Sequence, residues 1–462
     1  MKVKRETIRN DKRYYIEKIL GNIIWDRQAD IVDSIIKNTR TSVKSCHASG
    51  KSFIAARIVL KFLHSYAHSI ALTTAPTFRQ VTDILWTEIN TAFDKALVKL
   101  PGNMLNVRYD LDSDWFGLGL STDEPEKFQG YHSDHILVVA DEASGVTKKI
   151  FDAIEGITST GFVRILLIGN PTDPTGYFAD TFKSQIWSKQ TISCFDTPNF
   201  ENIKNIEQLK NSTEQQRLDS IVMPYLITPQ WVFERLQEWG EDSPLFQARV
   251  LGEFPTESDD TLIALKYVEQ AILNEKSEGE DWQIGLDVAR FGSDKTCFIG
   301  RKGNKIEFID WFQKEDTMQT TGRAMDYLRK YSDAKICVDE IGVGAGVIDR
   351  LKESEFSNRC IGINVAEKAQ DDENTKYVNL RAKGYWKLRE RFLAGDINLI
   401  DKGTIISDLT NMKYKFRSSD GALKIESKED IKKRGLRSPD LADALMLAFL
   451  GEVEMIPEIH FI

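Results

Sequence analysis

The stretch Ser45-Cys-His-Ala-Ser-Gly50-Lys51-Ser52 decides the fold expected for the first half of the chain. It matches the phosphate-binding loop G-x-x-x-x-G-K-[ST], with Ser45 in place of the first glycine. In such a loop, backbone N–H groups at a helix N-terminus cradle phosphate, the lysine neutralises the β and γ oxygens, and the last hydroxyl ligates Mg²⁺. Helix-forming residues follow at 53–61, as the motif requires. The loop residues that we expect to bind nucleotide are Ser45, Ser49, Gly50, Lys51 and Ser52, with Ser52 on the metal.

A Gly-Lys-Ser tripeptide also occurs by chance where a loop meets a helix, but the following apolar runs favour a nucleotide site. The run at 135–140 ends in Asp141 and Glu142. Asp141 suits a water-mediated Mg²⁺ ligand, and Glu142 can activate or orient the attacking water. Asn170 follows the run at 163–169, in the position of a γ-phosphate sensor.

Two further segments complete the nucleotide hypothesis. Trp25 and Gln28 offer an aromatic face and an amide for adenine. After a predicted strand at 69–74, the segment Thr74-Ala-Pro-Thr-Phe-Arg79-Gln80 resembles a helicase-type motif that contacts DNA or relays the nucleotide state, although an ordinary β–α turn is the alternative. Apolar strands that alternate with helical patterns indicate a parallel sheet flanked by helices. We therefore predict an α/β protein whose N-terminal domain, residues 1–227, is a P-loop ATPase.

Length and composition set outer limits. With 462 residues, of which 41% are hydrophobic, the chain can bury two cores. The segment 252–260 is turn-rich and acidic, so we place a helical linker or lid at 228–262. The formal net charge of −9 argues against a globally basic DNA-coating protein, so any nucleic-acid contact must be local.

The termini and cysteines indicate the compartment. Five scattered cysteines without a C-x-x-C pair predict reduced thiols, with no disulfide and no zinc site. The N-terminus is charged, and no apolar run approaches the ~20 residues of a membrane span. We expect a soluble, cytosolic protein without a membrane partner.

The second half predicts another α/β domain, residues 263–462. Three apolar runs joined by short glycine-containing turns are typical of an antiparallel meander. A later apolar strand, a hairpin with Asp-Gly in its turn and a final helix follow. These elements are predicted at 282–289, 296–300, 305–312, 335–339, 411–426 and 439–450.

Carboxylates stand at the ends of these strands and on the last helix. The candidate set is Asp287, Asp294, Asp339, Asp440 and Asp443. Two-metal nucleases need converging carboxylates, because one ion activates water while the other stabilises the leaving oxygen. Asp287 ends an otherwise apolar strand, where an unpaired charge is costly without a partner such as a metal. The pattern therefore predicts an RNase H-like nuclease site with Mg²⁺, or Mn²⁺ in its place.

Two plainer interpretations remain open. The chain has 70 Asp and Glu residues, most of which must lie on solvated faces, and Asp440 can simply cap its helix after Pro439. A basic run precedes the last helix and can hold the DNA backbone by point charges, with an exposed basic loop as the alternative. Its residues are Lys428, Lys432, Lys433 and Arg434.

Taken in order, these motifs resemble the large terminase subunit of tailed double-stranded DNA bacteriophages. The motifs that carry the resemblance are Trp25…Gln28, Gly50-Lys-Ser52, Thr74-Ala-Pro-Thr-Phe-Arg-Gln80, Phe128-Gln-Gly-Tyr-His132, Val139-Ala-Asp-Glu-Ala143, Gly169-Asn-Pro171, Gly285-Leu-Asp-Val-Ala289, Val338-Asp-Glu-Ile-Gly-Val-Gly-Ala-Gly346 and Ser438-Pro-Asp-Leu-Ala-Asp-Ala444. The resemblance implies an ATPase that pumps DNA into a procapsid and a nuclease that cuts concatemeric DNA. It also implies a small terminase subunit and the portal protein as partners, a homo-oligomeric ring during packaging, and the host cell cytoplasm as the compartment. The expected catalytic residues are Glu142, Asp287, Asp339, Asp440 and Asp443.

The sequence departs from that family at two positions. Many members carry an arginine inside the phosphate loop, whereas this loop has only His47, with Lys44 just outside. Arg79, or an arginine from a neighbouring subunit, is therefore our hypothesis for the cation at the γ-phosphate. Ser438 stands where a histidine often precedes the last acidic residues, which leaves open whether Asp440 or Asp443 ligates metal more directly.

Two other classes of protein stay open at this point. One is an ATP-dependent DNA helicase or translocase whose RNase H-like domain only binds DNA. The other is a structural or adaptor protein with a vestigial nucleotide site. Loss of metal-dependent DNA cutting in Asp287→Ala would separate the motor-nuclease from the helicase, and ATP turnover that is insensitive to Glu142→Gln would indicate the adaptor.

Overall fold

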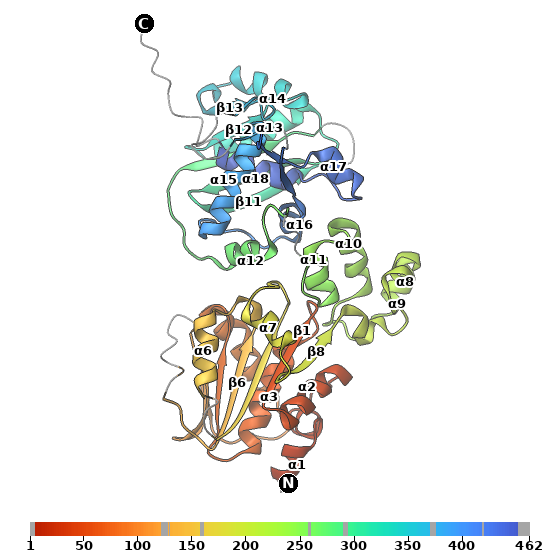
Figure 1. The fold of residues 1–462 in the computed structure, drawn as a ribbon, viewed down its shortest axis with the longest axis vertical. Coiled ribbons are helices and arrows are strands. Elements are labelled where there is room, and N and C mark those ends of the chain that lie inside the picture. The colour runs from red at the N-terminus through yellow and green to blue at the C-terminus, as the bar shows by residue number, and fades with distance from the viewer. Residues whose placement is uncertain are drawn as a thin grey trace. The chain divides into compact units, whose positions relative to one another are not determined.

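The computed structural model describes residues 5–121, 128, 130–157, 161–256, 260–289, 294–369, 376–417 and 420–450. The chain divides into two compact units (Figure 1). The first unit comprises Met1–Gln237 with Phe246–Thr256, and the second comprises Glu238–Leu245 with Glu257–Ile462. The segment 228–262 is shared between the two units, so a separate linker domain with those bounds stays a prediction.

The first unit is built on an eight-stranded sheet in the order β3-β4-β5-β2-β6-β7-β1-β8. From β5 to β8 all neighbours are parallel, which confirms the predicted parallel sheet. The strands β3, β4 and β5 form an antiparallel edge that the sequence pattern did not indicate. The strand bounds are Arg40–Ser45 (β1), Ile70–Thr74 (β2), Asn103–Met104 (β3), Arg108–Asp112 (β4), Trp115–Gly119 (β5), His135–Asp141 (β6), Phe162–Gly169 (β7) and Ser188–Ile192 (β8).

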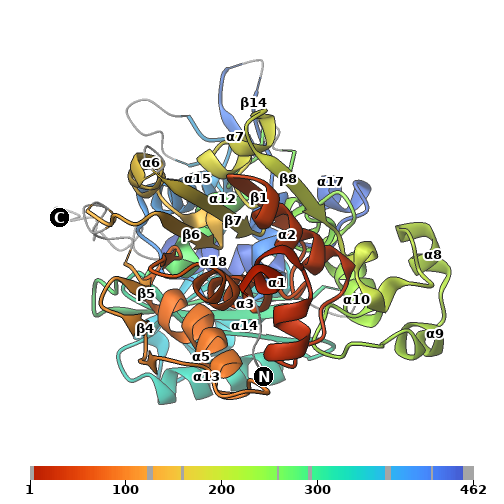
Figure 2. The same ribbon diagram turned by 90° about the horizontal axis from the view of Figure 1, so that it is seen from below.

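Both faces of this sheet are buried because its central strands are apolar on both sides. On β6, Leu137 and Val139 join the core beneath α3 (Lys51–Ser65), whereas Ile136 and Val138 join the core beneath α6 (Lys148–Ile157). Figure 2 shows α3 and α5 on one face and α6 and α7 on the other. Near-continuous apolar strands are what a doubly covered parallel sheet requires.

The other helical segments up to residue 251 are short. The α-helices are Arg5–Asn10 (α1), Asp26–Lys37 (α2), Phe78–Gln80 (α4), Thr87–Asp94 (α5), Tyr177–Lys183 (α7), Ile206–Asn211 (α8), Glu214–Asp219 (α9), Pro229–Trp239 (α10) and Pro244–Phe246 (α11). Tighter or wider helical turns lie at Tyr15–Ile19 (η1), Val81–Trp86 (η2), Ala143–Gly145 (η4), Cys194–Asp196 (η5), Pro198–Phe200 (η6) and Gln247–Leu251 (η7).

The second unit is built on a five-stranded sheet in the order β11-β10-β9-β12-β13. Strands β9 to β11 form the predicted antiparallel meander, and β12 and β13 run parallel to β9, which gives the RNase H-like arrangement. The strand bounds are Trp282–Asp287 (β9), Thr296–Lys302 (β10), Lys305–Phe312 (β11), Lys335–Asp339 (β12) and Cys360–Ile363 (β13).

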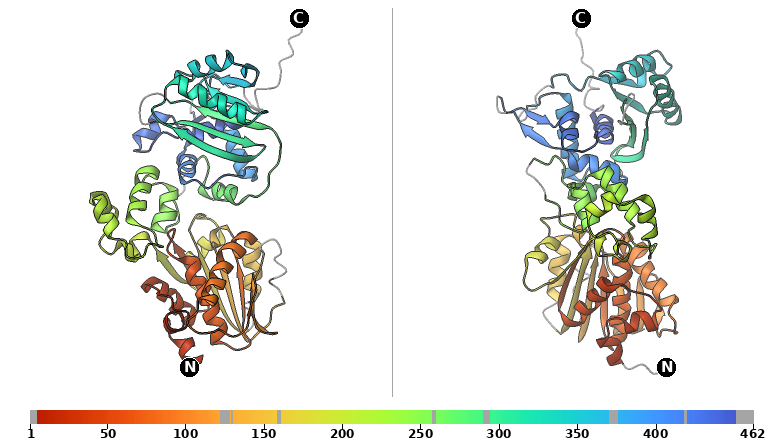
Figure 3. Two further views of the ribbon diagram at one scale, coloured as in Figure 1. Left: turned by 180° about the vertical axis from the view of Figure 1, so that it is seen from behind. Right: turned by 90° about the vertical axis from the view of Figure 1, so that its right-hand side faces the viewer.

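Helices cover both faces of this sheet as well (Figure 3). On one face, α13 (Thr317–Lys330) and α14 (Val343–Lys352) pack on Ile284, Leu286 and Ile336. On the other face lies α18 (Asp440–Leu450), which approaches β9 so closely that a Cβ on Gly285 would lie 1.9 Å from the Ala444 carbonyl oxygen. The close approach brings the first turn of α18 to the end of β9.

The predicted hairpin is present as a two-stranded sheet of β14 (Tyr414–Phe416) and β15 (Leu423–Ile425). Its predicted turn residues Ser418 and Ser419 lie outside the described residues. The remaining helices are Leu265–Leu273 (α12), Ser357–Arg359 (η8), Leu380–Ala394 (α15), Gly403–Asn411 (α16) and Lys428–Lys433 (α17). Within the described ranges, none of the helices has the length and apolar character needed to cross a membrane.

Candidate nucleotide and metal sites

The predicted nucleotide residues meet at one edge of the first sheet because three parallel strands end there. Asp141 on β6 lies opposite Ile168 on β7, and Gly169 on β7 lies opposite Lys44 on β1. The segments after β1, β6 and β7 therefore leave the sheet side by side, where open α/β sheets bind ligands.

Four polar contacts join these segments into a single network. The Lys51 Nζ donates to Asn170 Oδ1 over 3.1 Å and lies 3.5 Å from Glu142 Oε1. The Ser52 hydroxyl donates to Asp141 Oδ2 over 2.6 Å. Asn170 Nδ2 donates in turn to the Ser45 carbonyl over 2.7 Å. The network thus holds together the lysine, the hydroxyl and both carboxylates that the motif required.

The local backbone explains which glycines the loop needs. Gly50 precedes α3 with φ 80°, in the left-handed region that favours glycine. Ser45 instead is the last residue of β1, and its hydroxyl lies 2.9 Å from that of Ser49. An extended strand residue needs no glycine, so the serine at this position is compatible with the loop. Ala48 (φ 48°) and Glu142 (φ 47°) adopt the left-handed region without being glycine, a conformation that is common at functional sites.

Asp141 is the carboxyl at this edge of the sheet whose pKa is shifted. Burial, followed by the nearby charge of Glu142, raises the pKa of Asp141 to about 6, while the hydrogen bond from Ser52 acts in the opposite direction. A buried carboxylate of this kind is stabilised by a cation.

The remaining predicted nucleotide residues lie outside this network. Gln28 is buried, and its Nε2 donates to the carbonyls of Ser49 (3.3 Å) and Gly50 (3.4 Å), so it supports the loop backbone. Trp25 is also buried. Arg79 is exposed and pairs with Asp83 over 3.3 Å, one turn away. The predicted roles of Trp25 and Gln28 at adenine, and of Arg79 at the γ-phosphate, stay predictions.

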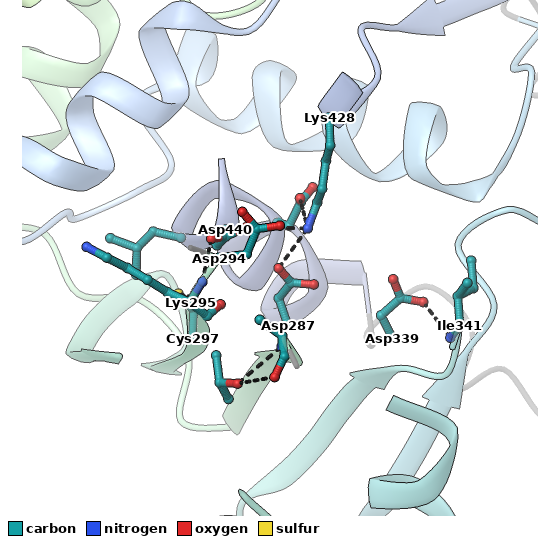
Figure 4. A network of polar contacts seen from close by, with 12 residues as sticks. Asp287, Asp294, Lys295, Cys297, Asp339, Ile341, Lys428 and Asp440 are labelled. Carbon is teal, nitrogen blue, oxygen red and sulfur yellow. Dashed lines mark hydrogen bonds and ion pairs between the residues drawn. The ribbon is translucent and has the colours of Figure 1, made fainter. Parts of the chain in front are cut away.

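The second site lies where β9 ends beneath α18. Lys428 Nζ, from the first residue of α17, lies 2.9 Å from Asp287 Oδ2, 3.0 Å from Asp443 Oδ2 and 3.5 Å from Asp440 Oδ1 (Figure 4). Three of the predicted carboxylates therefore converge, and the lysine that we expected on the DNA backbone lies among them.

Asp339 approaches the same place from β12, the parallel neighbour of β9. Its Oδ1 accepts the backbone N–H of Ile341 over 3.1 Å (Figure 4). Together with Asp287, Asp443 and Lys428 it lines a cavity of about 420 Å³. Burial raises the pKa of Asp339.

Asp294 and Asp440 line a different cavity, of about 190 Å³. Asp440 Oδ2 accepts the backbone N–H of Lys295 over 2.8 Å, and Asp294 pairs with Lys432 over 2.8 Å. In the part of the chain that the structure describes, no group of three or more His, Cys, Asp or Glu side chains is arranged as a ready metal cage. Lys428 lies among Asp287, Asp440 and Asp443, and Lys432 pairs with Asp294, so ammonium groups balance these negative charges. The predicted role of the five carboxylates at metal stays a prediction.

The two buried carboxyls Asp287 and Asp443 differ in the direction in which their pKa is shifted. Burial, followed by the charge of Asp443, raises the pKa of Asp287 to about 7, against the effect of the Lys428 ammonium. Burial also disfavours the charged form of Asp443, but Arg381 and Lys428 hold its pKa below the usual value. The pair therefore holds one carboxylate firmly ionised and one that titrates near neutrality.

Two residues that the sequence analysis missed orient Asp443. Tyr385 Oη donates to Asp443 Oδ1 over 2.7 Å, and Arg381 Nε donates to the same oxygen over 3.1 Å. Asp443 Oδ2 is buried without a hydrogen bond and faces the Lys428 ammonium as an ion pair. Arg381 and Tyr385 stand four residues apart on one face of α15, a spacing too common to mark them from sequence alone.

The remaining predicted DNA-contact residues are paired with acidic side chains. Lys432 pairs with Asp294, Lys433 with Asp430 over 2.9 Å, and Arg434 with Glu426 over 2.7 Å. Their role at DNA stays a prediction.

Comparison with known proteins gives one relative along nearly the whole chain. No protein-family model matches the sequence. A probable terminase large subunit of Enterobacteria phage P7 is 27% identical over 470 residues, which cover 92% of this chain and 90% of the relative. The chain is a homologue of that terminase large subunit.

Solved structures were compared as well. The large terminase of the thermophilic bacteriophage D6E is 9% identical over 97% of this chain and 98% of its own, with a TM-score of 0.39. The nuclease domain of the large terminase subunit gp2 of bacterial virus Sf6 is 22% identical over 41% of this chain and 97% of its own, with a TM-score of 0.37. The large terminase nuclease of thermophilic phage G20c with bound magnesium is 16% identical over 42% of this chain and 98% of its own, with a TM-score of 0.32.

The homology matters for the two sites because it spans both units. The aligned 92% of the chain is too long to leave out either the unit with Lys51 or the unit with Asp287. The match to the terminase large subunit therefore covers at least part of each compact unit.

Proposed function

We propose that this chain is the large subunit of a terminase, which uses ATP to move double-stranded DNA into a procapsid and cuts concatemeric DNA with a metal-dependent endonuclease. The observation that carries the proposal is the presence of two separate buried acidic networks, each built around a lysine, in a homologue of a terminase large subunit. A helicase with an inert second domain is not favoured, because it gives no reason for the buried carboxylates around Lys428.

In the first unit, Lys51 and Ser52 bind the nucleotide phosphates and Glu142 handles the attacking water. Glu142 Oε1 lies 3.5 Å from Lys51 Nζ, so a carboxylate faces the place where the lysine holds the γ-phosphate. We assign to Glu142 the orientation of water and acceptance of its proton. Asn170 links Lys51 to the Ser45 carbonyl and can report the state of the γ-phosphate to the loop.

Ser52 and Asp141 fit a magnesium ion at this site. Their oxygens lie 2.6 Å apart, and both are the hard donors that Mg²⁺ prefers. Bound there, Mg²⁺ supplies positive charge that stabilises the phosphate oxygens during hydrolysis.

In the second unit, Asp287, Asp339 and Asp443 fit divalent cations. Their donor atoms are carboxylate oxygens at one cavity, and Asp443 Oδ2 is buried without a hydrogen bond. Bound there, Mg²⁺ or Mn²⁺ supplies an activated water and stabilises the leaving oxygen. We propose Asp443 as the more direct ligand of the two helix residues, because Asp440 accepts from Lys295 and lines the other cavity.

The chain's own residues also prepare this site. Arg381 and Tyr385 fix Asp443 Oδ1, which leaves Oδ2 turned toward Asp287 and Lys428. Fixed orientation of a ligand by outer hydrogen bonds raises metal affinity. We propose double-stranded DNA as the substrate, with a small terminase subunit, the portal protein and further copies of this chain in a ring as partners in the host cytoplasm.

The proposal is tested by assaying the full chain for ATP hydrolysis and for cutting of a supercoiled plasmid, with and without Mn²⁺ and EDTA. Glu142→Gln should reduce ATP turnover at least ~100-fold while plasmid cutting persists. Lys51→Ala serves as a second variant at the same site. ATP turnover that survives both substitutions, or cutting that persists in EDTA, would contradict the proposal.

A further inference from the structure

A row of side chains crosses the second sheet from the carboxylates to its exposed edge. Asp287 on β9 lies opposite Cys297 on β10, and Cys297 lies opposite Trp311 on β11. Directly opposed residues point to the same face of a sheet, so Trp311 shares the face that carries Asp287. Adjacent strands lie about 4.8 Å apart, which places the Trp311 backbone about 10 Å from that of Asp287. Strand β11 is an edge strand of this sheet.

Trp311 carries a cation on its ring. Its side chain is 46% exposed, and Lys295 Nζ lies 3.8 Å from the ring centroid. Lys295 forms no ion pair in the part of the chain that the structure describes, in contrast to the paired Lys428, Lys432 and Lys433. Figure 4 shows the Lys295 side chain directed away from Asp287. An unpaired ammonium on an exposed indole is ready to receive an anion.

The start of α18 offers a second unsatisfied donor nearby. Ser438 is only 5% exposed, and its hydroxyl has no hydrogen-bond partner. It lines the cavity of about 190 Å³ together with Lys295 and Asp440. The backbone N–H of Lys295 donates to Asp440 over 2.8 Å, which ties this cavity to the carboxylate site. Two further carboxylates at this cavity, Asp294 and Asp408, pair with Lys432 and Arg437. The Lys295 ammonium and the Ser438 hydroxyl can therefore bind a ligand with anionic oxygens.

We propose that Lys295, Ser438 and Trp311 form a subsite for the backbone of the DNA strand that is cut. The inference rests on the proposed nuclease function of the second unit. Lys295 contacts a phosphate near the one at Asp287 on the same strand, because its ammonium lies on the Trp311 ring and the Trp311 backbone is about 10 Å from that of Asp287. The Trp311 ring packs against a sugar or base of the same strand, as aromatic side chains do along nucleic-acid channels. A DNA strand offers both groups along its whole length, phosphates for Lys295 and flat bases for Trp311.

The test compares Lys295→Ala, Lys295→Arg and Trp311→Ala with the control Lys302→Ala in the full chain. Lys302 is the last residue of β10, the strand that follows Lys295, and it pairs with Glu280, away from the row. Binding of a fluorescent duplex is measured by anisotropy in EDTA at several salt concentrations. Mn²⁺-dependent cutting of the same duplex then gives KM and kcat, and thermal melting reports folding.

The subsite predicts weaker DNA binding by roughly 3- to 10-fold in Lys295→Ala, with the slope of log affinity against log salt reduced by about 0.9. KM should rise while kcat changes little, Lys295→Arg should recover most of the affinity, and Trp311→Ala should weaken binding without changing the salt slope. Equal affinity and salt slope in Lys295→Ala and Lys302→Ala, with a wild-type chain that cuts DNA, would overturn the subsite alone. A wild-type chain that neither binds nor cuts DNA would overturn the nuclease proposal and the subsite with it.

Discussion

Asp141 and Asp287 are two buried carboxyls at the proposed cation sites. Each is a buried carboxyl at the end of a strand, and burial raises the pKa of Asp141 to about 6 and that of Asp287 to about 7. A carboxyl whose pKa is raised on folding stabilises the fold while it is protonated, and that contribution is lost as the pH rises through the folded pKa. Near neutral pH the ionised Asp141 and Asp287 therefore lower the free energy of unfolding. A cation bound at either site offsets this loss.

The first prediction concerns Asp141→Asn. Without nucleotide, the variant should melt at a higher temperature than the wild type at pH 8, because the buried charge is absent. The gain in the free energy of unfolding is at most about 3 kcal/mol. The pKa of Asp141 is raised by about two units, and each unit corresponds to about 1.4 kcal/mol. At pH 4 the two proteins should melt alike. Calorimetry across this pH range checks the prediction, and a difference that does not grow between pH 5 and pH 7 would refute the assigned burial cost.

The second prediction concerns the orientation of Asp443. Tyr385→Phe removes the hydroxyl that donates to Asp443 Oδ1 and leaves the ring in place. The Mn²⁺ concentration for half-maximal DNA cutting should rise roughly 10-fold, as for other outer-shell partners of metal ligands. Tyr331→Phe is the matched control, because the Tyr331 ring packs on Trp282 and Phe308 and its hydroxyl forms no hydrogen bond within the described residues. The same Mn²⁺ requirement in both variants would speak against a positioning role.

Residue types at strand ends could be predicted, but their partners could not. Asp141 and Asp287 could be singled out because each is a charged residue at the end of an apolar strand. Arg381 has no such signal, because its contact with Asp443 spans 62 positions in sequence. The position of Lys428 among the carboxylates had no sequence signal either. It belongs to a run of charged residues that is expected to be exposed, and only tertiary packing buries one residue of that run.

Among the elements, β9 and α18 pack closely where they carry Asp287 and Asp443. A Cβ on Gly285 would lie 1.9 Å from the Ala444 carbonyl oxygen and 2.5 Å from the Ala448 nitrogen. Both contacts are backbone atoms of a helix, which cannot move aside separately. The distance between the Asp287 strand end and the Asp443 helix turn is therefore set by a glycine.

The third prediction follows from that contact. Gly285→Ala should push α18 away from β9, destabilise the second unit by at least about 1–3 kcal/mol and abolish DNA cutting. ATP turnover, which depends on the first unit, should remain. Gly346→Ala is the control, since no heavy atom lies within 4 Å of its added Cβ and alanine favours the helix. Thermal melting of both variants tests this prediction. Equal melting temperatures would show that the contact between β9 and α18 tolerates a methyl group.

Elements with a strong apolar period were predictable, and short or polar ones were not. The strands β6, β7, β9, β11 and β12 match the expected ranges within about two residues because apolar residues dominate β6 and β7 and recur along the other three. The edge strands β3 and β4 are short and polar, and their place depends on β5. Within the helical segment expected at 228–262, the chain leaves the helix after α10, where Gly240 adopts φ 82°.

At the scale of the whole molecule, each compact unit carries one of the two proposed activities. The first unit contains the Lys51–Asn170 and Ser52–Asp141 contacts, and the second contains the carboxylates around Lys428. The net charge of −9 fits this division, because DNA must then be held by a few local cations such as Lys295 and not by the surface as a whole.

The most direct measurement of the central claim is plasmid cutting and ATP turnover by Asp287→Ala and the wild-type chain under identical conditions. The wild type should cut a supercoiled plasmid in Mn²⁺ and lose this activity in EDTA. Asp287→Ala should leave the plasmid intact and hydrolyse ATP at a rate close to that of the wild type. A variant that still cuts the plasmid, or a wild type that hydrolyses ATP but never cuts, would contradict a motor and a nuclease in one chain.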